Sequence, residues 1–248
     1  MKTAIFVLAH PDDDIFVLPL LLHYKKTHEI IVFFTTDTSQ GYGDRRIREA
    51  KKAMNSIGIN QVHFAGTEAS AKDGLTIERA DVLITSLEKT VVNSKVDTLV
   101  THVLEGGNPD HDLAFAISAI VKLRVQEQIH FIAVPFYRRH NWSWVPYVVN
   151  SKISNMTGTI FRLPLRSFIS IPFFCRHYVS QMKVLFCLIP FLLIQIMLRR
   201  GLLYYSSTNI YDYIQNLPNN LMIERQYPYN SRMFYEQLLE LWKVHETR

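Results

Sequence analysis

Short apolar runs alternate with helix-like segments over the first 134 residues, and this alternation restricts the chain to few folds. The apolar runs are rich in β-branched and aromatic residues and predict strands at 3–8, 30–34, 62–65, 96–101 and 129–134. The segments between them predict helices at 15–26, 44–57, 77–92 and 113–125. Strand–helix–strand units of this kind form parallel sheets. The sequence therefore predicts an α/β fold with a doubly wound, mainly parallel, Rossmann-like sheet.

The alternation stops after Pro135. Residues 136–170 are typical of loops and short strands, and residues 231–244 predict an amphipathic closing helix. Residues 184–198 are apolar except for Gln195 and contain Pro190; a run of 15 residues is shorter than the roughly 20 that span a bilayer. A buried or interfacial helical hairpin is favoured there over a transmembrane segment. We expect one domain over 1–248, with an α/β core at 1–135 that carries the site and a less regular, helical part at 136–248 that supplies substrate-side loops.

Charge is distributed unevenly along the 248 residues, although the net charge is only +5. Residues 128–211 contain no Asp or Glu, yet they carry nine Arg and Lys and many aromatic residues, including Trp142 and Trp144. Basic, aromatic and apolar residues together favour a surface that faces anionic lipid headgroups. The alternative is a solvated basic face over an ordinary core. Nucleic acid is a weaker candidate because no binding motif accompanies the charge.

Two cysteines, Cys175 and Cys187, provide no disulfide framework, so buried reduced thiols are expected. No signal peptide is expected, because the first apolar run is cut short at His10 and Pro11. A cytoplasmic location, with peripheral contact at the inner membrane face, is the resulting prediction.

An imidazole and three carboxylates follow the first predicted strand, at His10, Asp12, Asp13 and Asp14. Ligand sites gather where strands of an open α/β sheet end. Carboxylates this close repel one another, so a cation that neutralises them is favoured. The alternative is that Asp13 or Asp14 caps the helix that follows. Capping accounts for one carboxylate and leaves the other groups unexplained.

A second polar cluster, residues 102–112, follows the predicted strand at 96–101. Loops after two parallel strands open on the same edge of the sheet, so His10, Asp13 and His111 are expected to converge. Two imidazoles and one carboxylate, with a position left for water, are the ligand set of a catalytic zinc site. By itself, His111 is more typical of the start of a helix than of a metal ligand, and the pairing with the first cluster favours the ligand. No glycine-rich nucleotide-binding motif follows any predicted strand.

These residues resemble the motifs of a known family. Residues 9–14, Ala-His-Pro-Asp-Asp-Asp, are similar to the AHPDD(E) signature of the PIG-L/LmbE-type zinc-dependent N-deacetylases. Residues 105–112, Glu-Gly-Gly-Asn-Pro-Asp-His-Asp, resemble the second motif of that family, (H)PDH. Residues 36–37 and 46–58 match its T-D and R-x-x-E…LG patterns in order. The resemblance covers about 1–135, and residues 178–181 fit it loosely.

The resemblance implies an LmbE-type fold and an amidohydrolase that removes an acetyl group from an N-acetylglucosamine-type sugar in a glycoconjugate. Such sugars are attached to inositol, malate, a lipid or a glycopeptide. His10, Asp13 and His111 would bind Zn2+, with Fe2+ as another metal that shares such ligands. Asp12 would be the general base for a metal-bound water, and otherwise a partner that orients an imidazole. Arg46 would contact the substrate.

Two positions depart from the family pattern. Asp14 replaces a Glu; together with Asp110, it is expected beside the ligands as a hydrogen-bond partner or a cap. Asn108 replaces a His that is thought to stabilise the oxyanion or protonate the departing amine. An Asn amide can donate a hydrogen bond but delivers no proton at neutral pH. Either another group, such as His102, Glu105 or His140, supplies the proton, or turnover is slow or absent.

The sequence thus leaves two functional hypotheses. The first is a metal-dependent N-deacetylase whose N-acetyl amino-sugar substrate is linked to phosphate or lipid. The alternative is a catalytically weakened sugar-binding or accessory protein that keeps the metal site, an idea that rests on Asn108.

Overall fold

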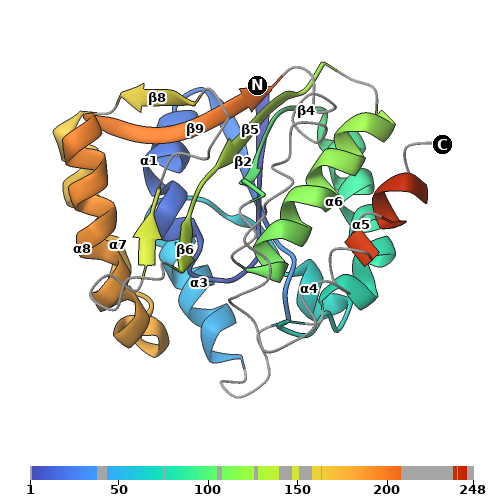
Figure 1. Ribbon diagram of the computed structural model, residues 1–248, viewed down its shortest axis with the longest axis horizontal. Coiled ribbons are helices and arrows are strands. Elements are labelled where there is room, and N and C mark those ends of the chain that lie inside the picture. Colours follow the sequence, from blue (N-terminus) through green and yellow to red (C-terminus); the bar gives the residue numbers. More distant parts are fainter. Residues whose placement is uncertain are drawn as a thin grey trace.

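The strands predicted in the first half of the chain lie side by side in one parallel sheet (Figure 1). The structure is a computed structural model that describes residues 2–37, 44–74, 76–104, 108–125, 128–139, 147–150, 158–162, 164–207, 237–238 and 240–244. The five parallel strands are β1 (Lys2–Leu8), β2 (His28–Phe34), β3 (Gln61–His63), β4 (Val96–His102) and β5 (His130–Val134). They stand in the order β3-β2-β1-β4-β5. The predicted doubly wound, mainly parallel α/β fold is confirmed.

Two later strands extend this sheet in the antiparallel sense. Strand β9 (Gly201–Ser207) pairs with β5, and β8 (Thr159–Arg162) pairs with β9, which makes a seven-stranded sheet among the described residues. A separate hairpin consists of β6 (Tyr137–Arg139) and β7 (Tyr147–Val149). Strand β9 was not predicted from the sequence. The division of the chain into a core and substrate-side loops stays a prediction.

Helices cover both faces of the sheet (Figure 1). One face carries α1 (Asp14–Tyr24), α3 (Arg45–Ser56), α7 (Leu165–Cys175) and α8 (Met182–Arg199). The other face carries α5 (Ala80–Ser94) and α6 (Pro109–Val125), with the short α4 (Ala65–Glu68) and the 3-10 turn η1 (Thr76–Arg79) nearby. Phe6 and Leu8 of β1 point to the first layer, and Ile5 and Val7 point to the second. This alternation of buried side chains is expected of a central strand.

The apolar stretch at 184–198 forms one continuous helix, so the predicted hairpin within it is wrong. Helix α8 runs through Pro190, which removes one backbone hydrogen bond, while Leu185, Leu188 and Leu192 pack into the core. With the 3-10 turn η2 (Val179–Gln181), residues Val179–Arg199 are long and apolar enough to cross a membrane by length and composition alone. Such helices also occur in the cores of soluble proteins.

The last described helix and the two cysteines each match their predictions in part. Residues 237–238 and 240–244 are helical, and Leu238 packs against the core under α5 and α6, which confirms this part of the predicted closing helix. Residues 231–236 lie outside the described residues. Cys175 and Cys187 are free thiols. Cys175 is buried as predicted, whereas Cys187 is exposed, because it lies on the outer side of α8.

The strand order places a topological switch point beside β1. Its neighbours are β2 on one side and β4 on the other, and the segments that follow β1 and β4 enter helices on opposite faces, α1 and α6. Ligand sites of open α/β sheets lie outside the carboxyl ends of the strands at such a point. His10 follows β1, and His111 lies in the first turn of α6.

Candidate metal and catalytic site

A tight turn after β1 presents the first polar cluster. The backbone N–H of Asp13 donates to the carbonyl of His10 at 3.1 Å, and the N–H of His10 donates to Oδ2 of Asp13 at 2.7 Å. Asp13 stands at the position before α1 but makes no capping hydrogen bond with its side chain. Its carboxylate turns back toward His10, so capping does not explain this residue.

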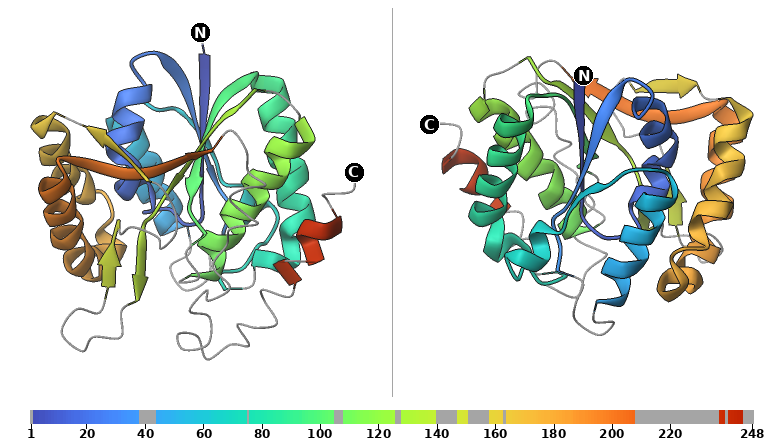
Figure 2. Two further views of the ribbon diagram at one scale, coloured as in Figure 1. Left: turned by 45° about the horizontal axis from the view of Figure 1, so that its top comes forward. Right: turned by 180° about the vertical axis from the view of Figure 1, so that it is seen from behind.

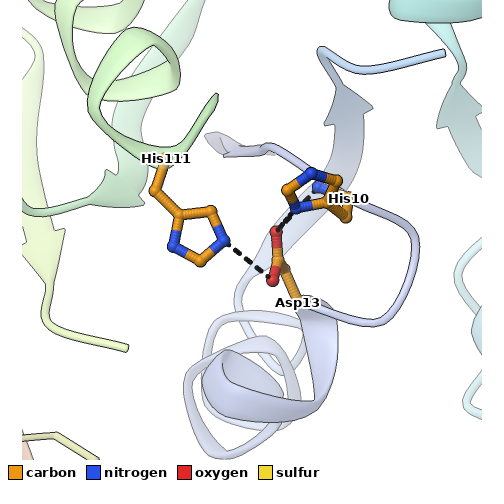
Figure 3. A group of neighbouring side chains, drawn as sticks. All are labelled: His10, Asp13 and His111. Carbon is orange, nitrogen blue, oxygen red and sulfur yellow. Dashed lines mark hydrogen bonds and ion pairs between the residues drawn. The ribbon is translucent and has the colours of Figure 1, made fainter. Parts of the chain in front are cut away.

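Asp13 lies between two imidazoles (Figure 3). Its Oδ2 is 3.4 Å from Nδ1 of His10, and its Oδ1 is 3.4 Å from Nε2 of His111. One ligand atom from each of these residues lies within 4.8 Å of the other two, and all three residues are buried. Segments about a hundred residues apart therefore converge as expected. Their role as metal ligands stays a prediction.

Asp110 contacts the second nitrogen of the His10 ring, Nε2. Its Oδ2 is 3.3 Å from Nε2 of His10 and accepts the backbone N–H of Gly74 at 2.8 Å, while the Thr76 hydroxyl donates to Oδ1. A carboxylate on the second ring nitrogen is the usual device that orients a ligating histidine. This geometry fits the expected supporting role of Asp110.

A second group of donors shares His10. Asp73, a largely exposed residue before Gly74, places Oδ1 3.5 Å from Nε2 of His10, and His10, Asp73 and Asp110 also lie close enough to hold an ion. Sequence reasoning missed Asp73, since it follows no strand directly. Its Asp-Gly pair was the available signal, but such pairs mark many ordinary turns.

Charges in the cluster favour a cation. Burial alone would raise the pKa of Asp13, but the neighbouring rings of His111 and His10 hold this pKa well below its usual value. Burial alone would lower the pKa of His10, yet hydrogen bonds with Asp110, Asp13 and Asp73 raise it well above the ordinary range. The carboxylates thus stabilise positive charge at this point, which a divalent ion would also provide.

Asp12 lies beside the predicted ligands, but its carboxylate binds Arg46 of α3 and not an imidazole. Its Oδ1 accepts a hydrogen bond from Nη2 of Arg46 in α3 at 2.7 Å, and its side chain is 15% exposed, against 3% for Asp13. Burial raises the pKa of Asp12 to about 6, although Arg46 acts in the opposite direction. The φ angle of Asp12 is 145°, a region that L-residues rarely adopt and that is tolerated mainly at functional sites.

Arg46 therefore has a partner that the sequence did not reveal. It was predicted to contact substrate, and that role stays a prediction. In the structure, its guanidinium fixes the Asp12 carboxylate and also lies 3.5 Å from the carbonyl of Pro11.

His102 supports the site through a hydrogen bond to the backbone and through ring contacts. Its Nε2 accepts the N–H of Ala9 at 2.9 Å, and its ring stacks on His111 and packs at a tilt against Phe136. Burial and the nearby His111 hold the pKa of His102 well below its usual value. A ring that accepts through Nε2 and remains neutral is a poor proton donor, so His102 does not suit the role of general acid.

Asn108 caps helix α6. Its Oδ1 accepts the N–H of Asp110 at 3.0 Å, and its carbonyl accepts the N–H of Asp112 at 3.0 Å. This cap fixes the first turn of α6, which carries His111. With Oδ1 directed at the helix, the amide NH2 is the end that could donate to a reacting oxygen. Glu105 and His140, the other candidate proton donors, lie outside the described residues.

Asp14 lies behind the site. It is fully buried in the first turn of α1, and the hydroxyl of Tyr178 donates to its Oδ2. Burial raises the pKa of Asp14 well above its usual value. Tyr178 belongs to the segment 178–181 that loosely resembled the family, and that resemblance was the signal for it.

The donor set fits a divalent metal ion. Two imidazoles and a carboxylate suit Zn2+ or Fe2+. Among the described residues, Nε2 of His111 is buried and makes no hydrogen bond of good geometry; its neighbour is the Asp13 carboxylate at 3.4 Å, the atom that would share a metal ion with it. The ion would satisfy this nitrogen and offset the carboxylate charge.

Fold and donor set together define an α/β protein with a polar, metal-compatible site at the switch point of its sheet. Residues 5–135, more than half of the chain, match the family described as PIG-L, GlcNAc-PI de-N-acetylase. The chain belongs to this family, as its motifs predicted. No curated protein matches the chain by sequence.

Solved structures share the fold at low identity. The zinc-inhibited form of teicoplanin deacetylase Orf2 superposes with a TM-score of 0.60 at 10% identity, over 83% of this chain and 99% of that one. The A40926 pseudoaglycone deacetylase Dbv21 gives 0.55 at 13%, over 74% and 84%. GalB, the 4-carboxy-2-hydroxymuconate hydratase from Pseudomonas putida KT2440, gives 0.56 at 14%, over 84% and 95%. These likenesses establish the LmbE-type fold.

Proposed function

We propose that this protein is a metal-dependent amidohydrolase that removes the acetyl group from an N-acetylglucosamine-type sugar in a glycoconjugate. One observation carries the proposal: His10, Asp13 and His111 converge at the switch point with the Asp12 carboxylate beside them. Family membership and the two deacetylases of similar fold support the reaction class. A hydratase also has a similar fold, and one fold hosts several chemistries, so the site and the family indicate the reaction and the fold alone does not.

The metal ion and Asp12 would have separate roles in the reaction. A divalent ion on His10, Asp13 and His111, Zn2+ by preference, would supply Lewis-acid chemistry that acidifies water and polarises the acetyl carbonyl. Asp12 accepts a proton as water adds to the carbonyl carbon. A carboxylate whose pKa is about 6 is ionised at neutral pH and still basic enough for this task. Arg46 keeps the carboxylate in place.

Breakdown of the tetrahedral species needs a proton on the departing nitrogen. Asn108 has no acidic proton, and His102 is neutral and engaged with Ala9. Asp12 holds the proton that it took from water and returns it to the nitrogen. The C–N bond then breaks to give acetate and a free amine. The Asn108 amide NH2 is the proposed donor to the oxyanion.

The substrate is proposed to be larger than the sugar alone, with an aglycone that carries phosphate or lipid. Support comes from the acid-free, basic span of residues 128–211. Arg46 offers donors beyond the one bound to Asp12, and these suit a phosphate or sugar hydroxyl.

Amine release is the decisive measurement. Chelated protein receives Zn2+ or Fe2+ and is incubated with N-acetylglucosamine linked to inositol, a phospholipid or a glycopeptide. We expect metal-dependent amine and acetate in equal amounts from at least one conjugate. Metal and sugar binding without any release would refute the hydrolase and support the sugar-binding alternative.

The Asp12→Asn variant tests the general base. Because the amide cannot take a proton, we expect kcat to fall by about 10²–10⁴-fold. Metal content, measured by elemental analysis, should stay unchanged, because Asp12 faces Arg46 rather than the ion. Asp44→Asn, an exposed change before α3, serves as the control. Undiminished kcat in Asp12→Asn would refute the assignment.

A further inference from the structure

The outer side of α8 carries no charge between its ends. The exposed residues of this helix are Met182, Lys183, Val184, Phe186, Cys187, Pro190, Ile194, Met197 and Leu198. Phe186 is 80% exposed and Leu198 is 76% exposed. A helix on the surface of a soluble protein normally turns polar residues outward. Helix α8 is apolar on its inner and outer sides alike, so its outer side is suited to an apolar medium.

The neighbouring helix continues this surface. Helices α7 and α8 pack against each other at one end of the molecule (Figure 2). Ile169, Pro172 and Phe173 of α7 are exposed, as is Val179 of η2. We call these residues, with the exposed apolar residues of α8, the apolar outer face. Clusters of exposed apolar side chains of this kind mark sites of association with proteins or membranes.

Basic residues near the apolar outer face favour an anionic membrane as its partner. The described basic residues around the apolar outer face, Arg176, Lys183 and Arg200, are exposed. Residues 128–211 contain no acid that would repel an anionic surface. Apolar side chains at the level of the acyl chains, with basic side chains at the headgroups, are what an interfacial helix needs. We infer that the apolar outer face docks on an anionic phospholipid membrane.

The helix lies in the membrane surface and does not cross the bilayer. Its inner side, with Leu185, Leu188 and Leu192, is buried in the core. Its N-terminal end is held by Glu49 of α3, whose carboxylate accepts the backbone N–H and hydroxyl of Ser180. A spanning helix would have to leave these contacts, although Val179–Arg199 meets the length requirement.

Vesicle binding tests the inference with the full chain. We expect co-sedimentation with vesicles that contain phosphatidylglycerol, and weaker binding to pure phosphatidylcholine. Phe186→Glu should weaken binding at least tenfold, and Lys183→Gln roughly fivefold. The matched controls lie on α5, on the other face of the sheet: Val82→Glu and Lys89→Gln, both at exposed positions, should bind like the unmodified protein.

Cys187 gives a second readout that needs no disruptive variant. It is an exposed thiol within the apolar outer face, whereas Cys175 is buried. An environment-sensitive fluorophore on Cys187 should shift to the blue when anionic vesicles are added. The same label on Val92→Cys, in a Cys187→Ser background, should not shift, because Val92 is an exposed residue of α5.

Several outcomes would overturn the inference. They are no binding to anionic vesicles, equal binding by Phe186→Glu, or equal fluorescence shifts at both labels. A dimer in light scattering that Phe186→Glu dissociates, without vesicle binding, would assign the face to a second copy. Retention on vesicles after an alkaline carbonate wash would indicate insertion in place of surface docking. None of these results depends on amine release, so this inference and the proposed function fail separately.

Discussion

Asp12 and Asp13 are adjacent in the chain, yet their carboxylates lie in different surroundings. Asp13 faces two imidazoles, which hold its pKa well below the usual value, so it remains ionised. Asp12 faces Arg46 and partly solvent, and burial raises its pKa to about 6. Neighbouring carboxyl groups with separated pKa values commonly mark a division between a fixed charge and a proton carrier.

Thiol reactivity should distinguish Cys175 from Cys187. Burial raises the pKa of Cys175 to about 12, so at pH 8 roughly one molecule in ten thousand carries its thiolate. The thiolate is the reactive species. We expect a disulfide reagent to titrate one thiol in the folded protein and two in denaturant. A rapid second thiol in the folded state would contradict the burial of Cys175.

Sequence reasoning predicted the main side chains of the site because their types and strand-end positions limit what they can do. His10, Asp13 and His111 follow two parallel strands, and parallel strand ends share an edge. It could not predict that Arg46 would bind Asp12, that His102 would accept from Ala9, or that Asp73 would approach His10. Those contacts depend on loop conformations that no residue pattern encodes.

The backbone of the short helix α4 packs closely against residues 35–36, directly after the end of β2. A Cβ on Gly66 would lie 2.3 Å from the carbonyl carbon of Thr36 and 2.4 Å from the carbonyl oxygen of Thr35. Backbone atoms cannot move aside as a flexible side chain can. We expect Gly66→Ala to lower the free energy of unfolding by about 1–3 kcal/mol in urea denaturation.

The control for this change is Glu68→Ala, an exposed position in the same helix, which should stay within about 0.5 kcal/mol. The segment after α4 leads to Asp73 and Gly74, so the Gly66 variant should also bind metal more weakly. Unchanged stability in Gly66→Ala would mean that α4 lies farther from β2.

Helix α3 connects the candidate site to η2, the turn that leads into α8. It carries Arg46, which binds Asp12, and Glu49, which binds Ser180. Glu49→Gln should lower the free energy of unfolding by about 1–2 kcal/mol, because the charged acceptor of two hydrogen bonds from Ser180 and one from Arg45 is lost. A double-mutant cycle with Ser180→Ala should give a coupling of about 0.5–3 kcal/mol.

Glu29→Gln, an exposed change on β2, is the matched control for Glu49→Gln and should show no coupling to Ser180→Ala. Additive effects of Glu49→Gln and Ser180→Ala would show that the Ser180 hydroxyl does not bond to Glu49 in solution.

Element prediction succeeded where periodicity was strong. The five parallel strands and the intervening helices were found because buried strands form continuous apolar runs. Helix α8 was mistaken for a hairpin because Pro190 was given more weight than the packing on either side of it. Strand β9 was missed because it crosses from α8 to pair with β5, a long-range contact that its own residues do not specify.

Metal binding should stabilise the whole molecule. At a free metal concentration one hundred times Kd, the free energy of unfolding should rise by about 2.7 kcal/mol. For a chain of this size, that corresponds to a Tm increase of about 5–10 °C in calorimetry. His111→Gln should lose most of the increase, because one imidazole ligand is absent.

His130→Gln is the control for this measurement, since His130 lies on β5 and contacts Ser206, away from the cluster. Equal Tm increases in His111→Gln and the unmodified protein would place the ion elsewhere.

The family match ends at residue 135, but the sheet does not end there. Strand β9 covers the far edge of β5 by pairing with Phe131, Ile132 and Ala133. A protein trimmed to residues 1–135 would keep every proposed ligand and expose a row of unpaired peptide groups beside apolar side chains. An unpaired strand edge of this kind pairs with strands of other chains. The first half is therefore expected to aggregate when expressed alone.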